Sequence, residues 1–456
     1  MPLQKNQVLT LRVERLSSDG SGVAHSPDGE TVFIPGAAPG DEARVRIVKD
    51  CKRYAFGILD EVLTPSPDRI PVDCAVAGPC GGCSLRHLDY AAELRAKQEN
   101  VADVFARIGG LDVPVLPIVG SPEVNRYRNK VQFPVGVDKS GKPCIGFYAG
   151  RTHRIVPCPD CRLQPGVLNE IGNALCAFFA EKGIQPYSEE TGRGLVRHIF
   201  LRRGAHSGQI MVCLVCTRAK LPSAEELCTR LKAQFAEITT ILLNVNAKNT
   251  NVILGTETHT LYGPGYIEDT LCGVPVQLGP LSFYQVNTLA AEQLYGIAAQ
   301  YAQLTPDDLL LDLYCGMGTI GLSMAAHCRE LIGVEIVPEA IESAKANAAR
   351  MGADVAAKSR FFCADAGQAA TRLAAEGLHP DIVMLDPPRK GCDEATLSAV
   401  VRMSPRRVVY VSCNPATAAR DAAWLEQNGY HAEKVQPVDL FPRTRHCECV
   451  LSFSKV

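Results

Sequence analysis

The sequence predicts an α/β protein whose C-terminal third forms a doubly wound parallel sheet, preceded by a small β-barrel and a central α+β domain. From about residue 305, short apolar strands alternate with helical stretches, which is the order typical of such a sheet. The first 63 residues instead consist of short strand-like runs separated by turns. A length of 456 residues is enough for two to four domains. We place the three domains at residues 1–65, 66–270 and 271–456.

The N-terminal segment has the pattern of an all-β barrel. Four runs alternate apolar and polar residues at strand spacing: Val8–Val13, Thr31–Ile34, Glu42–Val48 and Ala55–Leu59. Turn residues separate them, as in the stretch from Ser17 to Gly22. Small barrels of this kind often bind oligonucleotides, although a fold alone does not establish a function. The proline-rich stretch from Pro65 to Pro71 indicates a linker.

The central segment, residues 124–270, mixes strand-like runs with a helical stretch. The runs that look like sheet are Val131–Val137, Cys144–Tyr148, Val196–Arg202 and Ile241–Asn246. Ala224–Phe235 has the pattern of a helix that covers this sheet. We therefore expect an α+β domain.

The charge of the chain is balanced overall but uneven locally. A net charge of −2 and a pI of about 6.6 exclude a global field that attracts nucleic acid. Between Arg126 and Arg162, however, eight Lys and Arg residues accompany only two Asp residues, and between Arg44 and Arg53 five accompany one. Each stretch is either a set of solvated loops or a surface for a polyanion. We expect the basic edge of the central domain to face a polyanion.

Nineteen cysteines are many for a chain of this length. The first residues lack the apolar core of a signal peptide, and no apolar run approaches the roughly 18 residues needed to span a membrane. We therefore expect a cytoplasmic protein, in which clustered cysteines indicate metal binding or catalysis rather than disulfides. Cys213 and Cys216 are an exception, because they lie on an apolar run and are best explained as small buried hydrophobic residues.

Cys74, Cys80 and Cys83 form a C-x5-C-x2-C pattern on a loop rich in glycine and proline. Three thiolates so close together can bind one inorganic core, with a fourth ligand from Cys158 or Cys161. An iron–sulfur cluster is the favoured interpretation, and structural zinc is the alternative.

Chemically useful residues follow five successive strands of the predicted parallel sheet. They are a glycine loop, three carboxylates and a thiol: Tyr314–Thr319, Glu335, Asp365, Asp386 and Cys413. Ligands of an open α/β sheet bind at the carboxyl ends of its strands. A thiol at that edge is a candidate nucleophile, so Cys413 indicates an enzyme.

The glycine loop favours S-adenosylmethionine over a dinucleotide as the cofactor. Gly316 and Gly318 allow the backbone to approach a ligand, and Glu335 ends the next strand, where a carboxylate reaches ribose hydroxyls. The third glycine of the dinucleotide fingerprint is missing from its register, and S-adenosylmethionine has no pyrophosphate to bind. From their strand-end positions, Tyr314, Glu335 and Asp386 are expected cofactor contacts, with Asp365 near the adenine.

Five motifs in this order resemble those of the RNA uracil-5-methyltransferases, in particular the 23S rRNA group with a TRAM domain and an iron–sulfur cluster. The matching motifs are Phe283-Tyr-Gln285-Val-Asn287, Asp312-Leu-Tyr-Cys-Gly-Met-Gly318, Asp386-Pro-Pro-Arg389, Ser412-Cys413-Asn414-Pro415 and Arg445-His446-Cys447-Glu448-Cys449-Val450. The N-terminal barrel resembles a TRAM domain, so the resemblance covers nearly the whole chain. The chain departs from the pattern at Thr319, where many relatives have Asn, and at Cys158, which is additional.

The resemblance implies a Rossmann-like, S-adenosylmethionine-dependent methyltransferase domain with a covalent mechanism. Cys413 would attack C6 of uracil, which makes C5 nucleophilic toward a methyl group, and Glu448 would remove the C5 proton with His446 nearby. Gln285 would join the cofactor contacts. By family position, the ligands of a [4Fe–4S] cluster are Cys74, Cys80, Cys83 and Cys161.

The implied substrate is a uridine in an unpaired region of 23S rRNA. A stacked base cannot present C6 to a thiol and must be flipped into the pocket. The barrel and the stretch 126–162 would hold the flanking RNA, and Arg389 and Lys390 the target nucleotide. A tRNA target is disfavoured because tRNA-specific relatives generally lack the barrel and the cluster. The remaining alternatives are an RNA cytosine-5-methyltransferase, a catalytically inactive RNA-binding protein and a redox protein. We expect a monomer without a membrane or an obligate protein partner.

Overall fold

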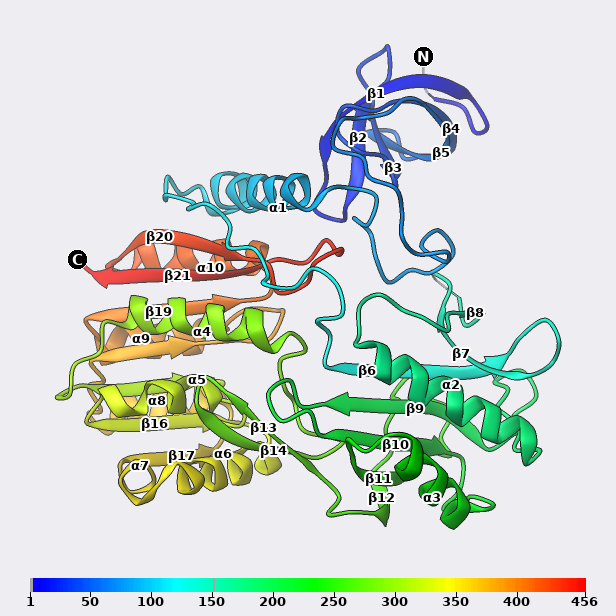
Figure 1. The fold of residues 1–456 in the computed structure, drawn as a ribbon. Helices are drawn as coiled ribbons and strands as arrows, with labels where there is room; N and C mark the ends of the chain where they lie inside the picture. Colours follow the sequence, from blue (N-terminus) through cyan, green and yellow to red (C-terminus); the bar gives the residue numbers. More distant parts are fainter. Residues whose placement is uncertain (1–2, 151) are drawn as a thin grey trace.

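A computed structural model describes residues 3–150 and 152–456 as a barrel and two large sheets with covering helices (Figure 1). Arg151, one of the eight cations in the basic stretch, lies outside the described residues. Within the described ranges, no helix combines the length and the apolar character that crossing a bilayer requires.

The N-terminal barrel is a closed sheet with strand order β1-β2-β3-β5-β4 (Figure 1). Its strands are β1 (Val8–Leu16), β2 (Ser21–His25), β3 (Thr31–Pro35), β4 (Glu42–Asp50) and β5 (Tyr54–Thr64). Alternate side chains such as Val32, Ile34 and Val45 fill its interior. The four predicted strands are confirmed. Strand β2 overlaps a predicted turn, because Ser21 and Gly22 have low strand propensity and pair only in the closed barrel.

Helix α1 (Tyr90–Val104) connects the barrel to the C-terminal sheet. Asp89 caps its N-terminus by accepting a 2.7 Å hydrogen bond from the backbone N–H of Ala92. The helix continues into a π-helical turn, Phe105–Gly109, and packs on α10 (Pro415–Gln427). Helix α10 begins two residues after Cys413. Helix α1 therefore packs directly on the helix that follows the predicted nucleophile.

The central domain contains a seven-stranded sheet of order β12-β11-β10-β9-β6-β7-β8. The strands are β6 (Lys130–Val137), β7 (Pro143–Tyr148), β8 (Ile155–Pro157), β9 (Val196–Arg203), β10 (Ile210–Cys216), β11 (Ile238–Val245) and β12 (Glu257–Tyr262). Helices α2 (Gly166–Glu181) and α3 (Ala224–Gln234) cover one face. From the other face, Phe200, Met211 and Cys213 join an apolar cluster shared with the C-terminal sheet. Cys213 and Cys216 are fully buried, which confirms their interpretation as small hydrophobic residues.

The C-terminal sheet has the order β17-β16-β15-β18-β19-β21-β20. Its strands are β15 (Leu309–Leu313), β16 (Glu330–Glu335), β17 (Ser359–Cys363), β18 (Ile382–Leu385), β19 (Arg407–Ser412), β20 (Tyr430–Val438) and β21 (Glu448–Lys455). The helices around them are α4 (Thr288–Ala302), α5 (Thr319–Met324), α6 (Pro338–Met351), α7 (Ala353–Lys358), α8 (Ala366–Ala375) and α9 (Glu394–Met403), and the hairpin β13 (Ile267–Leu271)–β14 (Val274–Leu278) precedes them. The five predicted parallel strands are confirmed. Strand β21 runs antiparallel between β19 and β20.

Candidate active site

The predicted nucleophile and the predicted base lie next to each other at the end of two adjacent strands. Cys413 follows the last residue of β19, and Glu448 begins β21. These strands pair antiparallel with Ser412 opposite Cys449, so one further step of the register places Cys413 opposite Glu448. Directly opposite residues have Cβ atoms about 4.5–5.5 Å apart. Because β21 is an interior strand, Glu448 is buried with only 5% of its surface exposed, while Cys413 is partly exposed.

Burial shifts the protonation of this group of residues toward neutral forms. It raises the pKa of Glu448 to about 8, with a further contribution from Asp386, and raises that of Asp386 to about 7. Burial, Glu448 and Asp386 also raise the pKa of the Cys413 thiol, whereas Arg389 lowers it. Two carboxyl groups that titrate near neutral pH beside a thiol can accept and return protons.

The loop that carries Cys413 is fixed to the loop that carries Arg389. Asn414 caps α10 through its side chain, and its Nδ2 donates to the carbonyl oxygen of Arg389 at 2.9 Å. The hydroxyl of Thr417 donates to the same oxygen at 3.3 Å. These bonds keep the Arg389 loop next to the thiol.

The glycine loop after β15 leaves room for a ligand. A Cβ atom at Gly316 would meet no atom within 4 Å, and Gly316 N–H donates to Glu335 Oε2 at 3.2 Å. Tyr314 has a left-handed φ of 67°, which is uncommon for a residue with a side chain and typical of functional loops. Its hydroxyl lies 3.3 Å from Thr396 Oγ1, so the ring points toward α9.

Asp312 is a candidate that the sequence did not single out. Its Oδ2 accepts from Gly321 N–H at 3.0 Å, but its Oδ1 is buried without a partner. Burial raises the pKa of Asp312 to about 8, with added contributions from Asp386 and Glu335. Asp312 lies inside the buried strand β15, between Leu311 and Leu313, and a position inside an apolar run is assigned to the core by pattern analysis. A buried carboxyl group with an unused oxygen and two further carboxyl groups near it fits a ligand that carries positive charge, as the sulfonium and ammonium groups of S-adenosylmethionine do.

The two other expected cofactor contacts also hold local structure. Gln285 is partly buried, and its backbone oxygen accepts a 2.8 Å hydrogen bond from Asn129 Nδ2 of the central domain. Asp365 caps α8 by accepting from Gln368 N–H at 3.1 Å. Phe283 of the same motif as Gln285 is 72% exposed.

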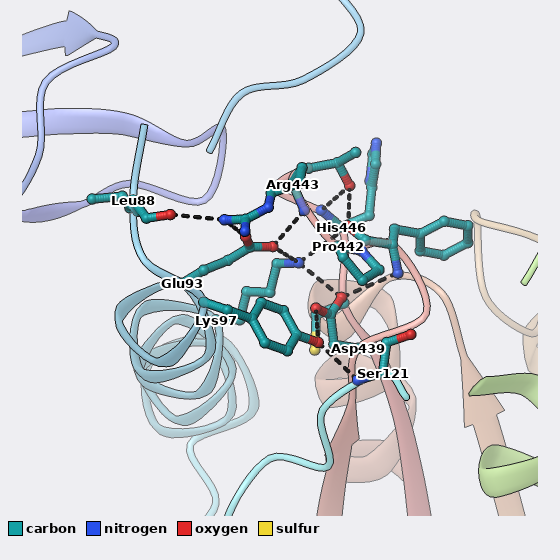
Figure 2. A network of polar contacts seen from close by, with 12 residues as sticks. Leu88, Glu93, Lys97, Ser121, Asp439, Pro442, Arg443 and His446 are labelled. Carbon is teal, nitrogen blue, oxygen red and sulfur yellow. Dashed lines mark hydrogen bonds and ion pairs between the residues drawn. The ribbon is translucent and has the colours of Figure 1, made fainter. Parts of the chain in front are cut away.

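The segment between β20 and Glu448 is held by a buried network of charges (Figure 2). Lys97 Nζ of α1 donates to Glu93 Oε1 at 2.7 Å and to Asp439 Oδ1 at 2.8 Å. The hydroxyl of Tyr90 donates to Asp439 Oδ2 at 2.9 Å, and Arg443 N–H donates to Glu93 Oε1 at 2.7 Å. All four charged side chains are almost fully buried. Helix α1 therefore positions the loop that leads to His446 and Glu448.

The five cysteines of the predicted cluster region lie close enough to influence one another. Burial raises the pKa of Cys80, and Cys161 and Cys74 raise it further. A hydrogen bond from Cys158 lowers the pKa of Cys161 to about 6. In the described residues, however, no group of His, Cys, Asp or Glu side chains could hold a metal ion.

A buried arginine borders these thiols. The Arg86 guanidinium is 3% exposed, interacts with the thiol of Cys83, and donates from Nη1 to Asp73 Oδ1 at 2.7 Å. Its Nε and Nη2 are buried without a partner. Unsatisfied cationic donors beside a group of thiols fit a centre that carries negative charge.

The chain is similar to known RNA methyltransferases. A family model described as tRNA (uracil-5-)-methyltransferase matches residues 206–456, and a TRAM domain model matches residues 2–59. RNA methyltransferases of Halalkalibacterium halodurans (43% identity, 98% of this chain and 97% of the relative) and Bacillus cereus (41%, 100% and 98%) are similar over their whole length. Neither relative's name specifies its RNA.

A solved structure extends the comparison. The tRNA (uracil-54, C5)-methyltransferase of Pyrococcus abyssi, in complex with S-adenosyl-L-homocysteine, has 26% identity and a TM-score of 0.78 and covers 98% of this chain and 100% of its own. This tRNA enzyme matches along the whole chain, including the barrel. The presence of the barrel therefore does not distinguish an rRNA substrate from a tRNA substrate.

Proposed function

The chain belongs to the tRNA (uracil-5-)-methyltransferase family and carries a TRAM domain, and from this we propose that it methylates C5 of a uridine in 23S rRNA through a covalent adduct with Cys413. Membership of this family implies the general activity, which is S-adenosylmethionine-dependent methylation of uracil in RNA. The identity of the RNA and the roles of individual residues are the proposal.

The observation that supports the mechanism is the β19–β21 register, which sets Cys413 opposite Glu448. The Cys413 thiolate forms a bond to C6 of uracil, and the electron pair of the C5–C6 double bond moves toward C4 and its oxygen. Bound S-adenosylmethionine supplies the methyl group that C5 then takes. Glu448 removes the proton from C5, and the C6–sulfur bond breaks to restore the double bond and the thiolate. A carboxylate with a pKa near 8 is a stronger base than an ordinary glutamate, which suits this last step.

Arg389 supports the first step. Its positive charge lowers the pKa of Cys413, and the bonds from Asn414 and Thr417 to its carbonyl oxygen keep its loop beside the thiol. A thiolate forms more readily when a positive charge stabilises it.

Asp312, Asp386 and Glu335 are proposed to surround the positively charged part of S-adenosylmethionine. Burial, and to a smaller extent Asp386 and Glu335, raises the pKa of Asp312 in the free protein, and a bound cation would stabilise its ionised form.

We also propose that Cys74, Cys80, Cys83 and Cys161 bind a [4Fe–4S] cluster that organises the central domain. The C-x5-C-x2-C spacing of the first three cysteines, on a loop rich in glycine and proline, supports a thiolate-bound inorganic core. The unsatisfied donors of Arg86 give additional support, because a thiolate-bound cluster is an anion.

A tRNA uridine is the second candidate substrate, because the Pyrococcus abyssi relative that matches the whole chain is a tRNA enzyme. Sequencing of 5-methyluridine in rRNA and tRNA from cells with and without this protein distinguishes the two. A 5-methyluridine lost from 23S rRNA supports the proposal, and one lost only from tRNA replaces it with the second candidate.

Trapping tests the covalent step. RNA from the deletion strain, labelled with 5-fluorouridine, should form a stable adduct with the wild-type protein and S-adenosylmethionine, because fluorine cannot leave as a proton does. Peptide mapping should place the adduct on Cys413, and Cys413→Ala should form none. Turnover retained by Cys413→Ser would contradict the mechanism.

A further inference from the structure

Three cations on the central sheet lack acidic partners. Lys130, the first residue of β6, is directly opposite Arg202 of β9, and Arg128 precedes the strand by two residues. None of the three forms an ion pair within the part of the chain that the structure describes. Like charges directly opposite each other on a sheet are destabilising. This arrangement therefore lowers the stability of the free protein.

The side chains around Lys130 have unused capacity for an anion. Arg202 is 1% exposed and donates from its two terminal nitrogens to the carbonyl oxygens of Gly279 and Ser282, each at 2.7 Å. The Nε atoms of Arg202 and Arg128 are both buried without a partner. Burial, followed by Arg202 and Arg128, lowers the pKa of Lys130 to about 8. An anion at this place would satisfy free donors and relieve repulsion.

The cations lie beside the candidate active site. Asn129, between Arg128 and Lys130 in sequence, donates from Nδ2 to the backbone oxygen of Gln285 at 2.8 Å. The charge of Arg128 also reaches His446, two residues before Glu448. Arg128 and Lys130 are both partly exposed, so a ligand in the site can reach them.

We propose that Arg128 and Lys130 form a subsite for a phosphodiester group of the RNA strand next to the uridine that is methylated. Arg202 holds the loop 279–282 at its border. The inference rests on the proposed function and identifies which cations receive that substrate. A phosphodiester fits because its oxygens accept from several donors at once.

Two neighbouring arginines differ in a way that supports this assignment. Arg126 Nη2 is 2.8 Å from Asp160 Oδ1, and Arg162 Nη1 is 3.4 Å from Asp160 Oδ2. Arg126 also donates to the carbonyl oxygen of Cys161 at 2.8 Å. These cations are neutralised within the fold, whereas Arg128 and Lys130 in the same stretch are not.

Binding of a fluorescent oligouridylate, measured by anisotropy over a range of salt concentrations, tests the subsite. Lys130→Met should weaken binding about tenfold, and each lost phosphate contact should reduce the slope of log K against log[salt] by about 0.7. Arg128→Gln should behave in the same way. Lys220→Met, an exposed lysine of the same domain outside the basic stretch, is the matched control and should change neither quantity.

The temperature of thermal unfolding without RNA separates a phosphate-binding role of Lys130 from a structural one. If Lys130 stabilised the fold, its replacement would lower this temperature. Lys130→Met removes a like charge opposite Arg202 and should raise the unfolding temperature of the domain. A wild-type salt slope, or a lower unfolding temperature, in Lys130→Met overturns the proposal. Cys413→Ala should keep the wild-type slope while losing methylation. If the wild-type protein methylates no RNA and yet these salt slopes are as expected, the proposed function fails and the phosphate subsite stands.

Discussion

Replacement of Lys97 tests how the site is held together. Its Nζ is shared by Glu93 and Asp439 and also donates to the carbonyl oxygen of Phe441 at 3.2 Å (Figure 2). Lys97→Met keeps most of the apolar volume of the side chain and leaves two buried carboxylates without their common cation. Breaking a buried pair by removing one partner costs about 3–5 kcal/mol. Arg443 Nη1, 3.6 Å from Glu93 Oε2, partly compensates, so we expect about 3 kcal/mol.

Native-state hydrogen exchange is the suitable assay, because it separates the opening of this network from the unfolding of the other domains. The backbone N–H groups of Phe441 and Arg443 donate to Asp439 and Glu93, so their exchange reports the opening of this network. A loss of about 3 kcal/mol corresponds to exchange more than a hundredfold faster. The amide of Val13 in the barrel should keep its protection, since its bond to the backbone of Asp41 is independent of the network.

Two further variants make the test specific. Lys345→Met breaks an exposed pair with Glu342, which is worth about 0–1 kcal/mol, and should leave both amides unchanged. Adding Asp439→Asn to Lys97→Met should restore part of the protection, because one orphaned carboxylate becomes neutral. The single variant Lys97→Met should form less covalent adduct with 5-fluorouridine RNA than the wild type does, while its affinity for oligouridylate stays unchanged. Wild-type protection of Phe441 and Arg443 in Lys97→Met would refute the reasoning.

Three other predictions concern the carboxyl groups and the cluster. Glu448 has a raised pKa, so the folded state holds a proton that the unfolded state has lost between pH 4.5 and about 8, and stability falls as pH rises through this range. In pH-dependent denaturation, Glu448→Gln should make that fall less steep, since Asp312 and Asp386 still contribute to it, and equal slopes would contradict the burial argument. Affinity for S-adenosylmethionine should rise as pH increases toward about 8, the pKa of Asp312 in the free protein, and calorimetry should find a smaller rise for Asp312→Asn than for the wild type. Arg86→Met should reduce the iron and sulfide content of protein purified without oxygen, whereas the exposed Arg154→Met should not, and unchanged iron content would exclude Arg86 as a counter-charge.

The sequence alone determined the parallel sheet and the edge at which we expect ligands to bind. Strands such as Leu309–Leu313 and Ile382–Leu385 are buried on both faces, so they are recognisable as apolar runs, of which only the first is interrupted, at Asp312. The residues that follow them are Tyr314 and Asp386, and the rule that ligands bind at carboxyl ends then applies without any tertiary information. Local patterns of this kind are enough because the period of a strand and the chemistry of a turn are properties of adjacent residues.

Only the tertiary structure decided which distant residues meet. The sequence gives no sign that β21 lies inside the sheet, which buries Glu448 and sets it beside Cys413. It also does not distinguish Arg126, paired with Asp160, from Lys130, which has no acidic partner among the residues that the structure describes. These contacts join segments far apart in the chain, and their energies depend on burial and on the partners that packing supplies. Charge and hydrogen bonding in a low-dielectric interior are therefore set by the fold as a whole, while periodicity is set by the residues themselves.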